Sequence, residues 1–455
     1  MRRTMRPWPW RTDRPMSRRL GVLVLTAAAL AFSSRAFAQT ETPSPVPLPT
    51  AVEPVATERV TFDEAIRRAL EKNPSVGEAT QAIARAQALL DQASAVFRPT
   101  LDAVAGTTVI DEARGFSGNI TQPRTQSLFG ATLAYPVLAP GRWAARTQAK
   151  DQVAIARISA EETRRQVALT AGEAYLAVIA ARRQMEIAQQ DITTSAALAE
   201  YARLRLDAGQ GSRLNYVRSA QEVSTSEGRL LVAALAVARA QEALGVILFA
   251  DGPVDATSDP QLAPAAPPSP AGGDAWLLQR PDVRLFDAQV KASDRVVRDV
   301  WKSYLPSATV GFSPQYVTPP GFFAPAGTWA AVLQLQVPIY DGTFGATKRL
   351  RIAERETAQI QLEALKVEAR SEVRFAQEAV ARNEQIVATT RRSATDAEEV
   401  LRITEIAYRA GATTNIEVVQ AQQTARNAEL LAAVAEDRLR QARLDLLVAL
   451  GQFPQ

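Results

Sequence analysis

The 455-residue sequence contains no cysteine and no histidine. Without cysteine the chain can form no disulfide, no thiolate nucleophile and no lipid anchor behind a leader peptide. Without histidine it lacks the usual general base and the commonest zinc ligand. We also find no phosphate-binding loop, nucleophile motif or metal-ligand pattern. We therefore expect no enzymatic activity, no cofactor and no metal site.

Long hydrophobic runs are scarce as well. Beyond position 38 no segment has about 18 apolar residues in succession, so the sequence predicts no membrane-spanning helix there. Residues 1–38 predict a secretory signal peptide, with a basic start, an apolar stretch at 20–32, and Ala36 and Ala38 before the cleavage site. A transmembrane anchor is the alternative, for which this apolar stretch is short.

The predicted leader carries much of the positive charge. It holds eight Arg and one Asp, which leaves 44 basic and 47 acidic residues in the rest of the chain, a net charge of −3. The basic pI of about 9.4 therefore reflects the leader. We expect no nucleic-acid partner.

Proline is missing from two long blocks of the chain. Of 27 prolines, none lies within residues 142–251 or 340–452. Both blocks are rich in Ala, Glu, Gln, Arg and Leu, which favour helices, whereas proline breaks them. Each block is predicted to form two long helices that meet at a glycine. The first helix of each pair would span 142–207 or 344–409.

Proline and glycine positions repeat along the chain. The distance from Pro136 to Gly209 is 73 positions, and the distance from Pro338 to Gly411 is also 73. Such matched spacing predicts two tandem repeats. A Pro-, Ala- and Gly-rich stretch between them is typical of a linker. The predicted organisation is a signal peptide at 1–38, a Pro/Thr-rich arm at 39–58, a first repeat at 59–250, a linker at 251–274 and a second repeat at 275–455.

Alternating sequences precede the long helices in each repeat. Residues 307–316 and 329–338 alternate between apolar and polar side chains, and residues 128–135 do so more weakly. This period predicts strands with one buried face. A strand of about 10 residues can cross a bilayer, but a soluble hairpin packed on a core would show the same pattern. Aromatic residues near the strand ends are candidates for the membrane boundary: Tyr304, Tyr316, Trp329 and Tyr340.

One hairpin in each repeat would supply four strands per chain. Four strands cannot close a barrel, and open strand edges are not tolerated in lipid. If the strands cross a membrane, several chains must share one barrel, and three chains would supply twelve strands. The long helices would each extend roughly 100 Å, and their many alanines allow close packing as in a coiled coil. A coiled-coil rod without a pore would explain the helices alone.

Gly209 and Gly411 are predicted to end the first long helix of each repeat. A glycine in this position provides the positive φ that helix termination needs. Ser212 and Thr414 follow three residues later and are predicted N-caps of the next helix. The sequence T-N-I-E from Thr414 to Glu417 also matches a capping box. Each glycine therefore indicates a helical hairpin, two per chain.

In their order along the chain, these motifs resemble the TolC family of outer-membrane efflux and secretion channels. The motifs are TFDEAIRRALEKNP at 61–74, the FRPTL and YLPSA junctions, YPVLAPG, VPIYDG, and the two hairpins with GxxS and GxxT. The resemblance covers residues 60–451. It implies an α+β membrane protein of two tandem repeats. A homotrimer would form a twelve-stranded barrel in the outer membrane and a long antiparallel α-helical coiled-coil barrel through the periplasm.

The resemblance also implies a function and partners. A channel of this family is a passive exit duct of a tripartite efflux pump or type I secretion system, for small molecules or proteins. It lies in outer-membrane lipid and contacts a periplasmic adaptor (membrane fusion) protein, which links it to an inner-membrane RND-type or ABC transporter. The alternative is a periplasmic coiled-coil scaffold without a pore. Four hairpin-tip residues are candidates for adaptor binding: Gly209, Ser212, Gly411 and Thr414.

By the same resemblance, the periplasmic gate corresponds to the tip of the second repeat. Family members often carry acidic residues six and nine positions after the second hairpin glycine, where this chain has Glu417 and Gln420. A trimer would then have one ring of three carboxylates, so we expect weaker cation affinity than in a channel with two rings. The equivalent positions of the first repeat are Asn215 and Arg218. We hypothesise that Arg218 pairs with Glu417 and holds the tip closed.

A tyrosine is the last candidate gate residue. Tyr408 matches a family tyrosine that helps to latch the closed tip. Thr413, however, replaces a basic residue that belongs to the same latch in the family. We therefore do not expect the latch of the family to be complete in this chain.

Overall fold

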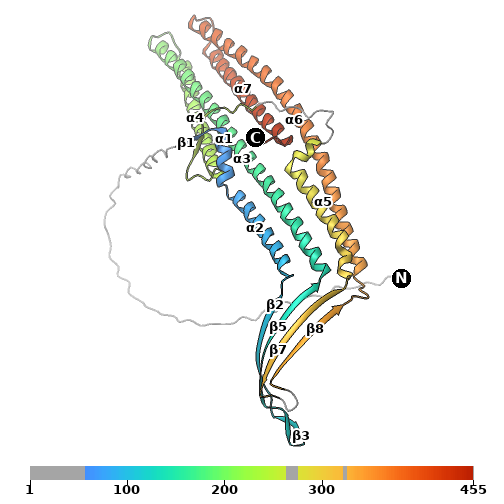
Figure 1. Ribbon diagram of the computed structural model, residues 1–455. Coiled ribbons are helices and arrows are strands. Elements are labelled where there is room, and N and C mark those ends of the chain that lie inside the picture. Colours follow the sequence, from blue (N-terminus) through green and yellow to red (C-terminus); the bar gives the residue numbers. More distant parts are fainter. Residues whose placement is uncertain (1–56, 263–274, 321–324, 454–455) are drawn as a thin grey trace, which may run out of the picture. The chain divides into compact units, whose positions relative to one another are not determined.

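The computed structural model describes residues 57–262, 275–320 and 325–453 (Figure 1). The predicted signal peptide, the arm up to position 56 and part of the linker lie outside the described residues. The first repeat contains α1 (Phe62–Lys72), α2 (Pro74–Ala95), β2 (Thr100–Val109), β5 (Thr125–Leu138), α3 (Pro140–Asp207) and α4 (Arg213–Ile247). The second repeat contains α5 (Pro281–Asp299), β7 (Ser307–Thr318), β8 (Gly327–Gln336), α6 (Phe344–Arg409) and α7 (Asn415–Ala449).

The long helices agree closely with the proline-free blocks. The bounds of α6 are those predicted, and its 66 residues extend roughly 100 Å. Helix α3 starts two residues earlier than predicted and has 68 residues. Pro140 stands in its first turn, where a missing N–H costs no hydrogen bond. Proline is thus absent from the interior of the long helices but present at the start of α3.

The four long helices pack as neighbours in the order α4, α3, α7, α6. Helix α3 contacts α4 and α7, and α7 contacts α6, so α4 and α6 are the edge helices of this layer. Helices α1, α2 and α5 also pack on α3. Among the described residues, α4 is the one helix whose length and composition would suffice to cross a membrane. That property is weak evidence by itself, and α4 here forms a hairpin with α3.

A hydrophobic core lies where α1, α3 and α4 meet. Tyr175 of α3 and Leu244 of α4 are fully buried there. The ring of Phe62 packs edge-on against Tyr175 with 5.5 Å between centroids, and the Tyr175 hydroxyl donates to the Ser258 carbonyl at 2.7 Å. Two three-residue strands, β1 (Glu58–Val60) and β6 (Val254–Ala256), pair in parallel beside this core. The sequence did not predict them, because three residues are too few to show alternation.

The four longer strands form one antiparallel sheet with the order β2-β5-β7-β8 (Figure 1). The two central strands, β5 and β7, come from different repeats. Strands β2 and β8 are the edges. Strand β8 ends at Gln336, two residues before the predicted end at Pro338, because proline has no N–H to donate to a strand ladder.

The register places most of the large apolar side chains of the four strands on one face. Leu101 pairs with Leu133, and Leu133 pairs with Phe312, which lies opposite Ala331. Directly paired residues share a face. The other face carries mostly polar or small residues, including Asp102, Thr132, Thr309, Ser313, Gln334 and Gln336, with Val104, Leu128, Val317 and Val332 among them. The predicted alternation of β7 and β8 is therefore confirmed and extends across the sheet.

Neither face of this sheet is covered by the part of the chain that the structure describes. No residue of β2, β5, β7 or β8 is buried, and Leu101, Trp329 and Leu333 are each at least 70% exposed. The interpretation as a soluble hairpin packed on its own core is therefore wrong. The apolar face needs another environment, and lipid provides one.

A small second hairpin extends the connection between β2 and β5. It consists of β3 (Arg114–Phe116) and β4 (Asn119–Gln122). Ser117 and Gly118, both with positive φ, form its turn. The sequence analysis did not predict this hairpin, since its strands have three and four residues.

Candidate functional site

Both helical hairpins turn at the predicted glycines. Gly209 has φ +69° and Gly411 has φ +79°. In each case the glycine N–H bonds the third carbonyl back, at 3.0 Å, and the next N–H bonds the fifth carbonyl back, at 2.9 Å in the first tip and 2.8 Å in the second. This double hydrogen bond is the Schellman arrangement, which satisfies the free carbonyls of a helix end.

The residues after the two glycines cap the next helix differently. The Ser212 hydroxyl accepts from the Leu214 N–H at 3.1 Å, so the predicted N-cap is confirmed. Thr414 also occupies the N-cap position but makes no side-chain cap bond. Its hydroxyl instead donates to the Glu417 carboxylate at 3.2 Å, and the Thr413 hydroxyl donates to the same carboxylate. The capping-box prediction is wrong in its hydrogen bonds, because the carboxylate competes for the hydroxyls.

Four of the candidate gate residues lie in the first two turns of α4 and α7. Glu417, Gln420 and Arg218 are exposed, and Asn215 is half-buried. Within the part of the chain that the structure describes, Arg218 forms no ion pair with Glu417. The hydroxyls of Thr413 and Thr414 surround Glu417 instead. The gate role of these residues stays a prediction.

Tyr408 connects the two hairpins. It is buried in a cluster with Leu198 of α3 and Val418 of α7, and its ring packs edge-on against Tyr201 of α3 with 5.6 Å between centroids. The Arg205 guanidinium lies over both rings, 5.9 Å from the Tyr201 centroid and 5.6 Å from that of Tyr408. Such cation–π contacts stabilise aromatic pairs. Sequence reasoning missed Tyr201 and Arg205, which no motif marks.

Further along the helices from the tips, a nearly buried charge cluster joins α3, α4 and α7. Arg426 of α7 lies 3.1 Å from Asp191 of α3 and 3.2 Å from Glu222 of α4. Arg229 of α4 reaches the same carboxylates, at 3.3 Å and 2.7 Å. Burial raises the pKa of Glu222, but hydrogen bonds from Arg229, Gln423 and Arg426 outweigh burial and hold its pKa below the usual value. Two arginines and two carboxylates thus compensate each other across both hairpins.

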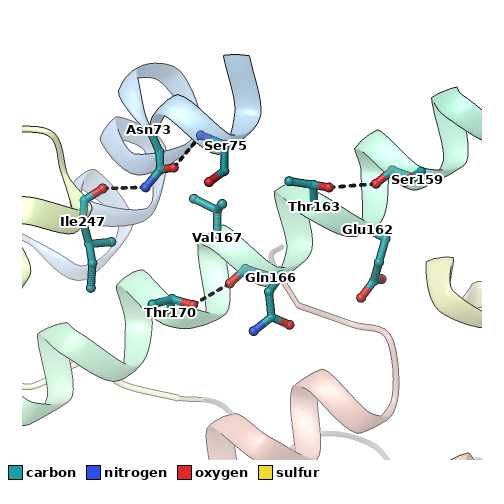
Figure 2. Close-up of a pocket in the computed structure, with 9 residues that line it drawn as sticks. All are labelled: Asn73, Ser75, Ser159, Glu162, Thr163, Gln166, Val167, Thr170 and Ile247. Atoms are coloured by element: carbon teal, nitrogen blue, oxygen red, sulfur yellow. Dashed lines mark hydrogen bonds between the residues drawn. The ribbon is translucent and has the colours of Figure 1, made fainter. Parts of the chain in front are cut away.

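A cavity of about 440 Å³ lies between α2 and α3 (Figure 2). Several of its polar side chains already have partners in the protein. Asn73 donates to the Ile247 carbonyl at 3.0 Å, and Thr163 and Thr170 each donate to a carbonyl one turn earlier in α3. No polar groups converge on its centre (Figure 2). The cavity therefore offers little to fix a ligand.

The candidate membrane-boundary aromatics stand at both ends of the sheet. Tyr316 lies near the end of β7 and Trp329 near the start of β8, whereas Tyr304 precedes β7 and Tyr340 follows β8. Trp329 is 70% exposed and Tyr340 is 88% exposed, while Tyr304 packs on Phe344 with 4.2 Å between centroids. Two levels of aromatics are what a membrane-crossing strand requires. Their boundary role stays a prediction.

A sheet with one apolar and one polar face and two open edges, continued by long helical hairpins, defines the protomer of an outer-membrane channel. The outer membrane efflux protein family matches residues 65–248 and 274–452, one match for each repeat. The chain belongs to this family. It is located in the outer membrane and acts as an exit duct for efflux. Members of the family are in general homotrimeric channels of tripartite pumps and not enzymes.

Solved structures share the fold. The outer membrane protein VceC of Vibrio cholerae is 18% identical with a TM-score of 0.72, over 86% of this chain and 96% of that one. The CmeC channel of Campylobacter jejuni is 14% identical with a TM-score of 0.74, over 87% of both chains. The open MtrE channel of Neisseria gonorrhoeae is 20% identical with a TM-score of 0.73, over 86% and 88%. No curated protein gives a significant match.

Proposed function

We propose that three copies of this chain close one twelve-stranded barrel and one helical tunnel. The observation that carries the proposal is the four-stranded sheet with free edges at β2 and β8 and no buried residue. Open edges are not stable in lipid, so further copies must pair with them. All neighbours in the sheet are antiparallel, so β2 and β8 run in opposite directions. The β8 of one copy can therefore continue the antiparallel pattern with the β2 of the next.

The edge helices support the same assembly. Both α4 and α6 carry large apolar side chains that no other part of the described chain covers. Exposed apolar surface of this extent marks an association surface. We propose that α6 of one copy packs on α4 of the next. The side chains concerned are Leu231, Val232, Leu235 and Val246 on α4, and Leu350, Ile360, Val367, Phe375, Val400, Ile403 and Ile406 on α6.

Disulfide trapping tests the closure of the barrel, because the native chain has no cysteine. A cysteine at Ala103 of β2 would be combined in turn with a cysteine at each β8 residue. We expect one register to give crosslinked trimers on a denaturing gel. The matched control is the Ala134→Cys, Gly311→Cys pair, which joins β5 to β7 within one chain and leaves the mass unchanged. If every β2–β8 pair runs as a single chain, the proposed closure is wrong.

We also propose that the hairpin tips form the periplasmic entrance and bind an adaptor protein. Glu417 would line the entrance and attract cations, with Gln420, Asn215 and Arg218 beside it. Single-channel recording of Glu417→Ala would test this role. We expect weaker block by cations, whereas Glu378→Ala, exposed on α6 and 33 positions before Gly411, should behave like the wild type. Unchanged block in Glu417→Ala would remove this residue from the gate.

Adaptor binding has a separate test. A photo-crosslinking amino acid at Ser212 or Thr414 would be expected to capture a periplasmic adaptor that works with an RND-type or ABC transporter. The same probe at Glu378 is the control. Capture from Glu378 alone would place the adaptor away from the tips.

A further inference from the structure

A groove of about 720 Å³ runs between α3 and α6, with α7 as its floor. Both α3 and α6 pack against α7. Each helix presents one face to the groove: positions 187–194 of α3, 391–405 of α6 and 422–432 of α7. The volume is in the range of small-molecule sites.

Contacts at both ends of the groove link α3 and α6. At one end Glu436 of α7 bonds Arg183 of α3 and also Arg391 of α6, the latter at 2.6 Å. At the end near the tips, Tyr201 of α3 packs on Tyr408 of α6. Along α3 these two contacts are 18 residues apart, or roughly 27 Å. The groove therefore belongs to the fold of a single chain.

The charged side chains of the groove that have no ion-pair partner among the described residues are carboxylates. Its three arginines are already engaged: Arg391 with Glu436, Arg402 with Glu399, and Arg426 with Asp191 and Glu222. Two of its carboxylates, Glu398 and Glu429, form no ion pair within the described residues. Burial, then the nearby charges of Glu398 and Asp191, raise the pKa of Glu429. A bound cation would relieve this repulsion.

A buried amide provides an independent sign of a ligand. Gln422 lines the groove and is only 6% exposed, yet neither its amide nitrogen nor its amide oxygen has a hydrogen-bond partner in the protein. An unpaired buried amide is costly. Gln422 and Glu429 lie seven residues apart on the same face of α7, which is roughly 10 Å.

We propose that this groove binds a linear organic polyamine, with its ammonium groups on Glu398, Glu429 and the Gln422 amide oxygen. A polyamine suits the site because it carries several separated cationic donors on one flexible chain, as the spacing of these acceptors requires. The described residues contain no group of three side chains able to hold a metal ion. The site lies within one protomer and does not depend on the proposed gate.

Calorimetric titration of the full-length protein in detergent with spermidine tests the proposal. We expect saturable binding to one site per chain, at constant ionic strength. Glu429→Gln and Glu398→Gln should each weaken binding about tenfold, the effect of losing one charge-assisted hydrogen bond. The control Glu378→Gln, an exposed α6 carboxylate outside the groove, should bind like the wild type.

Gln422→Leu separates a binding role from a structural one. Leucine has a similar volume and removes the unpaired amide, so this variant should unfold at a higher temperature than the wild type while binding spermidine more weakly. The proposal is overturned if the wild type shows no saturable binding, or if all variants bind alike. It is also overturned if Mg²⁺ at equal ionic strength displaces spermidine fully, because screening is then unchanged and the site would accept any multivalent cation.

Discussion

Helices α3 and α6 occupy equivalent places in the two repeats but have different surroundings. They have 68 and 66 residues, and both end in the same glycine turn. Yet α3 buries seventeen residues and α6 only six. Helix α3 is surrounded by α1, α2, α4, α5 and α7, whereas α6 packs mainly on α5 and α7 and meets α3 through Tyr408. The two helices therefore have similar lengths because the repeats are similar. They differ in the number of buried residues because they have different neighbours.

The difference agrees with the proposed assembly of several copies of the chain. The central helix α3 obtains its core from within the chain, around Tyr175. The apolar side chains of α6, such as Phe375 at 76% exposure, are left uncovered by the described residues. The sheet shows the same division, with β5 and β7 central and β2 and β8 at the edges. Four predictions, from the largest expected effect to the smallest, test this contrast.

Phe375→Asp should have the largest effect. Covering one phenylalanine contributes about 1.5–3 kcal/mol, and a trimer would lose this contribution at three interfaces. We expect the trimer band on unheated denaturing gels to disappear. Glu378→Gln, one turn away on the same helix, should leave the trimer intact. If Phe375→Asp still gives a full trimer band, α6 is not an edge that another copy covers.

Arg426→Met should destabilise the contact between the two hairpins within a chain. It leaves Asp191 and Glu222 nearly buried with less compensating charge, which typically costs about 3–5 kcal/mol. We expect faster proteolysis near the tips and a lower unfolding temperature. Arg443→Met is the matched control, because Arg443 pairs with Glu384 at a more exposed position, with 36% and 53% of the two side chains exposed, and exposed pairs contribute less than about 1 kcal/mol. Equal effects of the two variants would contradict the assigned role of the cluster.

Glycine substitutions should change stability in opposite directions at two places. Gly411→Ala forces a side chain onto φ +79° and should cost about 1–2 kcal/mol. Gly228→Ala, within α4 and with open space around the added Cβ, should stabilise by about 0.5–1 kcal/mol. Thermal unfolding followed by circular dichroism measures both. A stabilising Gly411→Ala would mean that the turn does not require a positive φ.

The smallest effect compares the two N-caps. Ser212→Ala removes a hydrogen bond to the Leu214 N–H and should cost about 1 kcal/mol. Thr414→Ala removes no such bond and should cost less. Both are measured by thermal unfolding. A larger loss for Thr414→Ala would show that the hydroxyl bond to Glu417 matters more to the tip than a backbone cap.

The parts of the fold that depend on backbone chemistry could be predicted from the sequence. Proline and glycine determine where helices begin and end, so α6 and both tips agree with the prediction. Alternation predicted the apolar face of β7 and β8. Strands β1 and β6 were missed because they are too short for any period.

The site was less predictable, because its contacts join residues far apart in the chain. Asp191, Glu222 and Arg426 belong to three different helices, and charged residues on a helix usually indicate a solvated face. Only the packing of α3 against α7 shows that they meet. Tyr408 was singled out, but its partner Tyr201 could not be identified from spacing. The capping-box prediction failed because the Glu417 carboxylate can accept either from a backbone N–H or from the threonine hydroxyls. The sequence does not show which of these bonds is preferred.

The pairing of β5 with β7 has a consequence for how the pore is put together. This junction joins a hairpin of the first repeat to a hairpin of the second. The proposed ring contains six similar hairpins. Junctions between hairpins of the same chain alternate with junctions between hairpins of different chains. Because of the duplication, three of the six junctions between hairpins form when each chain folds. The other three form only when chains associate, so they depend on protein concentration.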